Sequence, residues 1–198
     1  MRRKQLAPGI VVYSDVIEGF ETLVQDIEEG SASAGISWVQ SQIKKGNEIE
    51  TDTESRDTMT MGVPYSNVPV NNFGNFLDSF NSSLSNIFLS GFNVPEMDYK
   101  IEHNIETTWH DQYGILKYGS GQKFVNHVDD HKDFHRRIST VYYINEDYTG
   151  GEIVFPRFGI TYKPKANELI IFPSTYVYNH SVLPVIEGTR YAVVSWLK

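Results

Sequence analysis

The apolar residues of this chain follow two different spacings. In the first 100 residues they recur every three or four positions, which is the spacing of a helix with one buried face. From about Tyr99 onward, short β-branched and aromatic runs alternate with Gly, Pro and Asn, which is typical of strands joined by turns. The pattern therefore predicts helices in the first half of the chain and a strand-rich second half.

Two helices are predicted in the first half. Each has apolar residues on one helical face and a glycine after its last apolar position, where helices commonly end. The first covers residues 14–29 and ends at Gly30, and the second covers 72–89 and ends before Gly91. A short strand over 10–13 precedes the first helix.

Short strands are predicted throughout the second half. Their ranges are 115–118, 139–144, 152–155, 160–162, 169–172 and 191–197, and the segment 124–131 contains a further candidate strand. The turn 164–167 predicts a hairpin between two of them. No helical segment separates these strands, so a parallel α/β sheet is excluded. The predicted class is α+β, mainly β, in one domain over 1–198, with a helical support region at 1–99 and a strand-rich core at 100–198.

Composition narrows the class of protein further. The chain has no cysteine, which excludes disulfides, thiolate zinc sites and cysteine nucleophiles. Its 17 Lys and Arg against 25 Asp and Glu give a net charge of −8, which argues against a nucleic-acid partner. No apolar run approaches the ~18 residues of a membrane span. We therefore expect a cytoplasmic protein with neither nucleic-acid nor membrane partners.

The segment around His127 has the residue types of a metal site. If 124–131 is a strand, His127 and Asp129 point to the same side. A third ligand must come from elsewhere in the fold, and His180, 51 residues after Asp129, is the best candidate. Two imidazoles and one carboxylate form the facial triad that suits non-haem Fe(II).

Other interpretations of this segment stay open. A His-x-Asp sequence also occurs in ordinary solvated acidic loops. His127, His131 and His135 stand at i, i+4 and i+8, so a helix over this segment would place a zinc site on one face. The β-branched, glycine-flanked context favours a strand, and we assign His131 and His135 to a surface turn after it.

Arg190 starts the last predicted strand, ten residues after His180. A buried arginine calls for an anion, and its planar donor fork suits a carboxylate. Ala192, Val194 and Trp196 share its strand face, which leaves room for a ligand with the indole as a wall. The alternative is an ordinary salt bridge to one of the 25 acidic residues.

From about Tyr113 to Trp196 the chain resembles the iron(II)- and 2-oxoglutarate-dependent dioxygenases, specifically the prolyl 4-hydroxylase-like group. The motifs that carry the resemblance are Lys117–Gln122, His127–Asp129, Val141–Asn145, Gly150–Pro156, His180–Val185 and Gly188–Tyr191. Their order and spacing match the family. The first 100 residues match it only in outline.

The resemblance implies a fold and a metal site. The implied fold is a double-stranded β-helix, or jelly roll, with supporting N-terminal helices, and 100–198 is then the catalytic core. His127, Asp129 and His180 are implied to bind Fe(II), which would leave positions for 2-oxoglutarate and O2.

The resemblance also implies a cosubstrate site. Arg190 is expected to pair with the distal carboxylate of 2-oxoglutarate, and Tyr143 is expected to help hold that carboxylate. Tyr118 would line the same pocket, and Trp196 would lie near the metal. Ascorbate is expected as a further bound cofactor.

The implied activity is hydroxylation of an aliphatic carbon, with release of succinate and CO2. The resemblance favours a prolyl residue of a peptide or protein as substrate. A free amino acid, another non-prolyl substrate and a non-catalytic jelly-roll binding module remain alternatives. From the charge of −8, a protein substrate is expected to be neutral or basic. Residues 47–66 and 131–137 are candidate lids.

Overall fold

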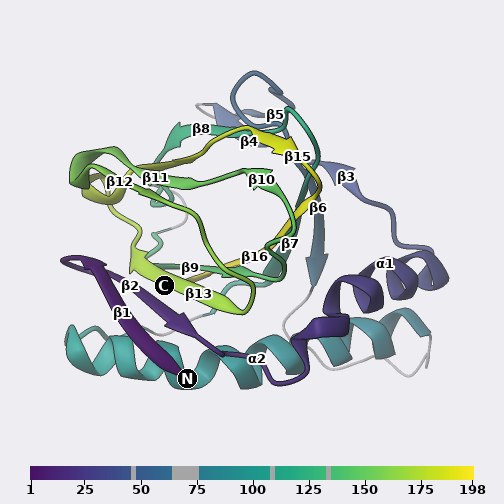
Figure 1. The fold of residues 1–198 in the computed structure, drawn as a ribbon, viewed down its shortest axis with the longest axis horizontal. Helices are drawn as coiled ribbons and strands as arrows, with labels where there is room; N and C mark the ends of the chain where they lie inside the picture. The colour runs from purple at the N-terminus through teal and green to yellow at the C-terminus, as the bar shows by residue number, and fades with distance from the viewer. Residues whose placement is uncertain (46–47, 64–75, 108–109, 133–134) are drawn as a thin grey trace.

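The computed structural model describes residues 1–198 apart from 46–47, 64–75, 108–109 and 133–134. Its largest element is an eight-stranded sheet in the order β1-β2-β13-β9-β16-β7-β6-β3, in which every pairing is antiparallel (Figure 1). These strands are β1 (Arg2–Ala7), β2 (Ile10–Ser14), β3 (Val39–Gln40), β6 (Met59–Val63), β7 (Tyr113–Tyr118), β9 (Ile138–Tyr143), β13 (Glu168–Pro173) and β16 (Arg190–Leu197).

Smaller sheets lie opposite one face of the large sheet (Figure 1). The main one has four strands in the order β12-β11-β14-β8, and two-stranded pairs β10-β15 and β4-β5 accompany it. Their bounds are β4 (Ile43–Lys45), β5 (Glu48–Glu50), β8 (Phe124–His127), β10 (Thr149–Gly150), β11 (Ile153–Phe155), β12 (Ile160–Tyr162), β14 (His180–Val182) and β15 (Val185–Glu187). The expected mainly-β class is confirmed.

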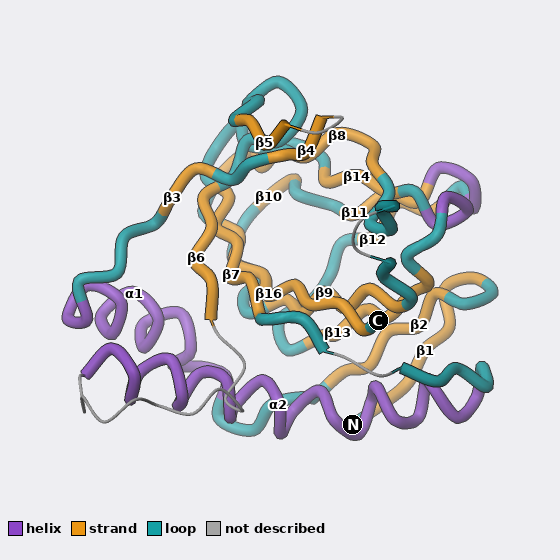
Figure 2. The backbone as a smooth tube through the Cα atoms, turned by 180° about the vertical axis from the view of Figure 1, so that it is seen from behind, coloured by secondary structure: helices purple, strands orange, loops and turns teal. Residues whose placement is uncertain are grey.

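The helices cover the other face of the large sheet (Figure 2). They are α1 (Leu23–Ala34) and α2 (Phe76–Glu102), with short 3-10 turns at Phe20–Thr22, Pro156–Phe158 and Tyr176–Tyr178. Among the described residues, no helix is long and apolar enough to cross a membrane.

Strand alternation divides the core into two layers. On β16, Tyr191 and Val193 pack in the layer that contains the helices. Ala192 and Val194 pack in the layer between the sheets. The predicted face of the last strand is thus confirmed, and it opens toward the space between the sheets.

The first predicted helix has the wrong bounds. Residue Asp15 adopts a left-handed backbone (φ 61°), and the side-chain oxygen of Asn167 accepts hydrogen bonds from the backbone N–H groups of Val16 and Ile17. These contacts hold the segment in a turn, so α1 begins only at Leu23.

Neither predicted glycine stop ends its helix. Gly30 lies inside α1, and a Cβ on it would stand 2.2 Å from the Phe80 ring. Gly91 lies inside α2, where a Cβ would stand 2.5 Å from Ile17 Cγ1. Both glycines therefore permit close packing. Residues 72–75, the predicted start of the second helix, lie outside the described part of the chain.

The predicted hairpin at 164–167 is also wrong. Strand β12 pairs with β11, whereas β13 pairs with β2 and β9 in the large sheet. The turn, in which Asn167 has φ 63°, therefore carries the chain from one sheet to the other.

Candidate active site

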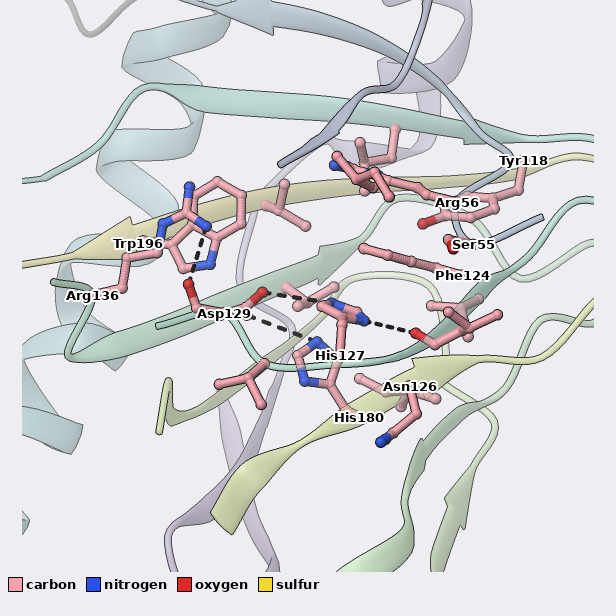
Figure 3. Close-up of a pocket in the computed structure, with 18 of the residues that line it drawn as sticks. Ser55, Arg56, Tyr118, Phe124, Asn126, His127, Asp129, Arg136, His180 and Trp196 are labelled. Atoms are coloured by element: carbon pink, nitrogen blue, oxygen red, sulfur yellow. Dashed lines mark hydrogen bonds and ion pairs between the residues drawn. The ribbon is translucent and has the colours of Figure 1, made fainter. Parts of the chain in front are cut away.

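Three predicted metal-ligating side chains meet between the sheets (Figure 3). His127 ends β8 and stands opposite His180 on the neighbouring antiparallel strand β14. Strand β8 stops at His127, so the strand does not continue to Asp129 as expected, and Asp129 lies in a bend after it. Ligand atoms of the three residues all lie within 4.8 Å of one another. Nε2 of His127 is 3.5 Å from Asp129 Oδ1, and Nε2 of His180 is 3.8 Å from Oδ2.

Neighbouring groups orient these side chains. Nδ1 of His127 lies 2.9 Å from its partner, the Val125 carbonyl oxygen, and Nδ1 of His180 lies 3.1 Å from that of Tyr178. A proton on each Nδ1 satisfies both carbonyls and leaves both Nε2 atoms as electron-pair donors toward Asp129. The Ser139 hydroxyl, which the sequence did not single out, donates to Asp129 Oδ2 at 2.7 Å.

Burial and neighbouring groups together set the charge states of His180 and Asp129. It lowers the pKa of His180 to about 4, and nearby His127 acts in the same direction, so His180 is neutral at pH 7. Burial acts to raise the pKa of Asp129, but the two imidazoles and the Ser139 hydroxyl outweigh it and hold that pKa below its ordinary value. A neutral imidazole and an ionised carboxylate are the forms that bind metal ions.

Aromatic rings enclose the two imidazoles. Phe124 stacks on His127 with ring centroids 3.6 Å apart. Phe172 meets His180 edge to face at 4.8 Å. These contacts fix the ring planes and exclude water from one side of the cluster.

Arg190 lies at the buried end of the same space, with 1% of its surface exposed. Its guanidinium carbon is 4.7 Å from the ring centre of Tyr118 and 5.0 Å from that of Tyr143. Within the described residues, Arg190 Nε and Nη1 and the hydroxyls of Tyr143 and Tyr148 have no hydrogen-bond partner. Such groups are costly to bury unless a ligand satisfies them, and a carboxylate in the cavity could accept from Arg190 and Tyr143, which line it.

Tyr148 is a buried neighbour of Arg190 that sequence reasoning missed, and it does not itself line the cavity. It lies in the loop after β9, and a Cβ on Gly151 would stand about 3 Å from both Tyr148 and Arg190. The lack of a side chain at Gly151 therefore leaves room for these two side chains.

A cavity of about 470 Å³ joins the metal-ligand cluster to Arg190. Its lining includes Tyr118, Tyr143 and Trp196. The volume is in the range typical of small-molecule sites. Trp196 borders the cavity and packs against Arg136, whose guanidinium carbon is 3.5 Å from the indole centre.

The remaining histidines of the sequence cluster stay outside the triad. His131 borders the cavity and His135 is exposed. Because 124–127 is a strand, the alternative prediction of a zinc site on one face of a helix is wrong.

The Tyr178 hydroxyl donates a hydrogen bond to the Pro8 carbonyl oxygen, which is a structural contact.

The two candidate lid segments reach the cavity where the structure describes them. Arg56, from the first segment, and Arg136, from the second, both line it. Residues 47, 64–66 and 133–134 of these segments lie outside the described part of the chain. Closure of either segment over the site stays a prediction.

Comparisons with known proteins agree with this geometry. Residues 113–198 match the family model described as the 2OG-Fe(II) oxygenase superfamily. The chain is 34% identical over 86 residues to a hypoxia-inducible factor prolyl hydroxylase of Caenorhabditis elegans, covering 39% of this chain and 12% of that one. It is 36% identical over 84 residues to a PKHD-type hydroxylase of Prochlorococcus marinus (strain MIT 9215), covering 39% and 37%. The chain thus spans well under two thirds of either relative.

The fold is also similar to that of a solved structure. This is a Trichoplax adhaerens prolyl hydroxylase in complex with a hypoxia-inducible factor peptide fragment, with a TM-score of 0.67 and 16% identity. The match covers 96% of this chain and 83% of the other, so the likeness in fold extends over the helices as well as the strands.

Proposed function

We propose that the chain is a 2OG-Fe(II) oxygenase, a hydroxylase that uses Fe(II), 2-oxoglutarate and O2, and the match of residues 113–198 to that superfamily supports the proposal. The convergence of His127, Asp129 and His180 beside a buried Arg190, whose Nε and Nη1 have no hydrogen-bond partner among the described residues, carries this proposal. We further propose a double-stranded β-helix as the fold, and a single domain over 1–198, since both helices pack on the large sheet.

The residues present fit the metal and the cosubstrate. His127, Asp129 and His180 offer two imidazole nitrogens and one carboxylate oxygen, a set that suits Fe(II) and leaves positions open. Arg190 and the Tyr143 hydroxyl offer donors to the distal carboxylate of 2-oxoglutarate. Tyr118 packs on the guanidinium and limits its movement. Trp196 forms a side wall of the cavity.

Each side chain has a task that follows from its surroundings. When bound, Fe(II), 2-oxoglutarate and O2 supply an oxidative decarboxylation, which yields succinate and CO2 and places the second oxygen atom in a C–H bond of the substrate. Arg190 orients the cosubstrate from its distal end. Ser139 keeps the Asp129 carboxylate turned toward the two imidazoles. Phe124 and Phe172 exclude water next to them.

A prolyl residue of a peptide or protein is the proposed substrate. The prolyl hydroxylases named above support it, and one of them was solved with a peptide bound. Ascorbate stays a prediction of the resemblance, and comparing succinate yield over many turnovers with and without ascorbate tests it.

The test is succinate release by the purified protein given Fe(II), 2-oxoglutarate and O2. We expect His127→Ala to reduce release to background, since it removes one of three ligands. The same variant should lose Mn(II) binding in a calorimetric titration, a readout that does not need turnover. A His135→Asn variant is the matched control, because His135 is exposed and Asn accepts its left-handed backbone (φ 31°). Normal succinate release by His127→Ala would show that the metal assignment is wrong.

A further inference from the structure

The cavity has a positive charge that the chain as a whole does not. The net charge of the sequence is −8. Among the described residues that line the cavity, Arg56, Arg136 and Arg190 are permanent cations, and Asp129 is the only carboxylate. The proposed function uses Arg190 for the cosubstrate and Asp129 for the metal. It gives Arg56 and Arg136 no role.

Arg56 is held beside the metal-ligand cluster by backbone and ring contacts. Its backbone forms an isolated β-bridge with Phe124, and its guanidinium carbon lies 4.8 Å from the centre of that ring. Nη1 donates to the Gln42 carbonyl oxygen at 3.3 Å. In the part of the chain that the structure describes, Arg56 has no ion-pair partner, and its buried Nε has no acceptor. The cavity therefore contains a guanidinium that is held in place and whose Nε–H has no acceptor among the described residues.

Arg136 stands on the opposite side of the cavity, with the metal ligands between the two arginines (Figure 3). It stacks on Trp196 and donates through Nη1 to the Asp129 carbonyl oxygen at 3.3 Å. Its Nε is 3.8 Å from a carboxylate oxygen of Asp111. Both guanidinium groups line the cavity, so an anion bound there would have a cation on two sides.

We propose that the substrate presents a carboxylate close to the carbon that is hydroxylated, and that Arg56 and Arg136 bind this carboxylate. This inference rests on the proposed function. Guanidinium groups pair with carboxylates through charge-assisted hydrogen bonds, which are stronger in a partly desolvated cavity. The carboxylate belongs either to an acidic residue next to the target in a peptide or to a free amino acid. The charge of the cavity thus favours an acidic substrate, in contrast to the expectation from the overall charge.

The experiment measures binding without turnover. The protein is loaded with Mn(II) and 2-oxoglutarate in the absence of O2 and titrated with peptides that differ only in having Glu, Gln or Lys beside one proline. L-proline and L-prolinamide form a second arm, which separates a free carboxylate from one on a flanking side chain. We expect the Glu peptide to bind at least about tenfold more tightly than the Lys peptide, or L-proline to bind at least about tenfold more tightly than L-prolinamide.

Charge reversal separates recognition from a structural effect. Arg56→Glu should invert the preference, so that the Lys peptide or L-prolinamide becomes the better ligand. Arg157→Glu is the matched control, because Arg157 is exposed, lies outside the cavity lining and should leave the preference unchanged. Equal binding within each arm, binding in neither, or an Arg56→Glu variant that keeps the original preference would overturn the inference.

Succinate release in the absence of any added substrate distinguishes failure of the inference about Arg56 and Arg136 from failure of the proposed function. Protein that releases succinate without any added substrate, yet shows no preference for a carboxylate, contradicts only the inference about Arg56 and Arg136. Protein that neither releases succinate nor binds 2-oxoglutarate contradicts the proposed function, and the inference falls with it.

Discussion

Three polar atoms at the closed end of the cavity are buried before any ligand binds: Nε and Nη1 of Arg190 and the hydroxyl oxygen of Tyr143. If a carboxylate binds there, Tyr143→Phe removes one of its donors. A hydrogen bond to a charged group contributes about 1.5–3 kcal/mol, so the Kd for 2-oxoglutarate should rise about tenfold or more. Calorimetric titration of the Mn(II)-loaded protein measures it.

The thermal stability of the ligand-free protein provides a second readout of Tyr143. Its hydroxyl has no hydrogen-bond partner among the described residues, so Tyr143→Phe should leave the Tm unchanged or raise it. Tyr162→Phe is the control with the opposite profile, because the Tyr162 hydroxyl donates to Glu168 outside the cavity. That variant should lose stability and keep its affinity for 2-oxoglutarate. A Tyr143→Phe variant that melts earlier but binds normally would assign the hydroxyl a structural role.

The sequence revealed the site residues whose chemical type is unusual. His127 and Asp129 stand two positions apart, and a buried arginine at 190 demanded an anion. Tyr148 gave no such signal, because one tyrosine among twelve in a loop has no diagnostic spacing. Arg136 gave no such signal either, because its stacking on an indole 60 residues later in the chain depends on the tertiary fold.

At the scale of elements, Gly91 decides how closely α2 approaches the turn before α1. Alanine is intrinsically favoured over glycine within a helix by about 1 kcal/mol. Here, however, the new Cβ would stand 2.5 Å from Ile17 Cγ1 and 3.3 Å from the Val16 carbonyl oxygen. We expect the overpacking to dominate, so that Gly91→Ala lowers the free energy of unfolding by about 1–3 kcal/mol in urea titration.

Ser83→Ala is the control for Gly91→Ala, because Ser83 is an exposed residue of the same helix. Its new side chain meets no crowded neighbour, so only helix propensity acts. The free energy of unfolding should then stay the same or rise by less than about 0.7 kcal/mol. A Gly91→Ala variant that is stabilised like this control would contradict the close contact with Ile17.

Element type was easier to predict than element extent. Apolar periodicity identified both helices and most of the strands of the second half. It misjudged their ends, because a glycine that admits a neighbouring side chain looks the same in sequence as one that ends a helix. The turn at 164–167 shows the same limit, since two strands joined by a short turn can enter different sheets. Local spacing also cannot indicate that Ile171 of β13 pairs with Val11 of β2, near the other end of the chain.

The molecule as a whole brings distant segments together at the site. The two imidazoles are adjacent only because β8 and β14 pair, and Arg190 faces them only because β16 lies in the opposite sheet. The sequence alone could state that these residues should converge, but their separation and the positive charge of the cavity follow from the packing of the sheets.

His110 joins the helical layer to the large sheet and makes the stability of the molecule dependent on pH. Burial acts to lower the pKa of His110, but the Glu96 carboxylate, 3.1 Å from its Nε2, outweighs this and raises it above the ordinary 6.5. The folded state therefore binds this proton more tightly than the unfolded state does. The stabilisation is complete below pH 6.5 and is lost as the pH rises through the folded-state value. The free energy of unfolding of wild type minus that of His110→Gln should thus decrease from about pH 6 to about pH 9 in urea titrations. A difference that stays constant or grows over this range would show that the ion pair with Glu96 does not set the charge of His110.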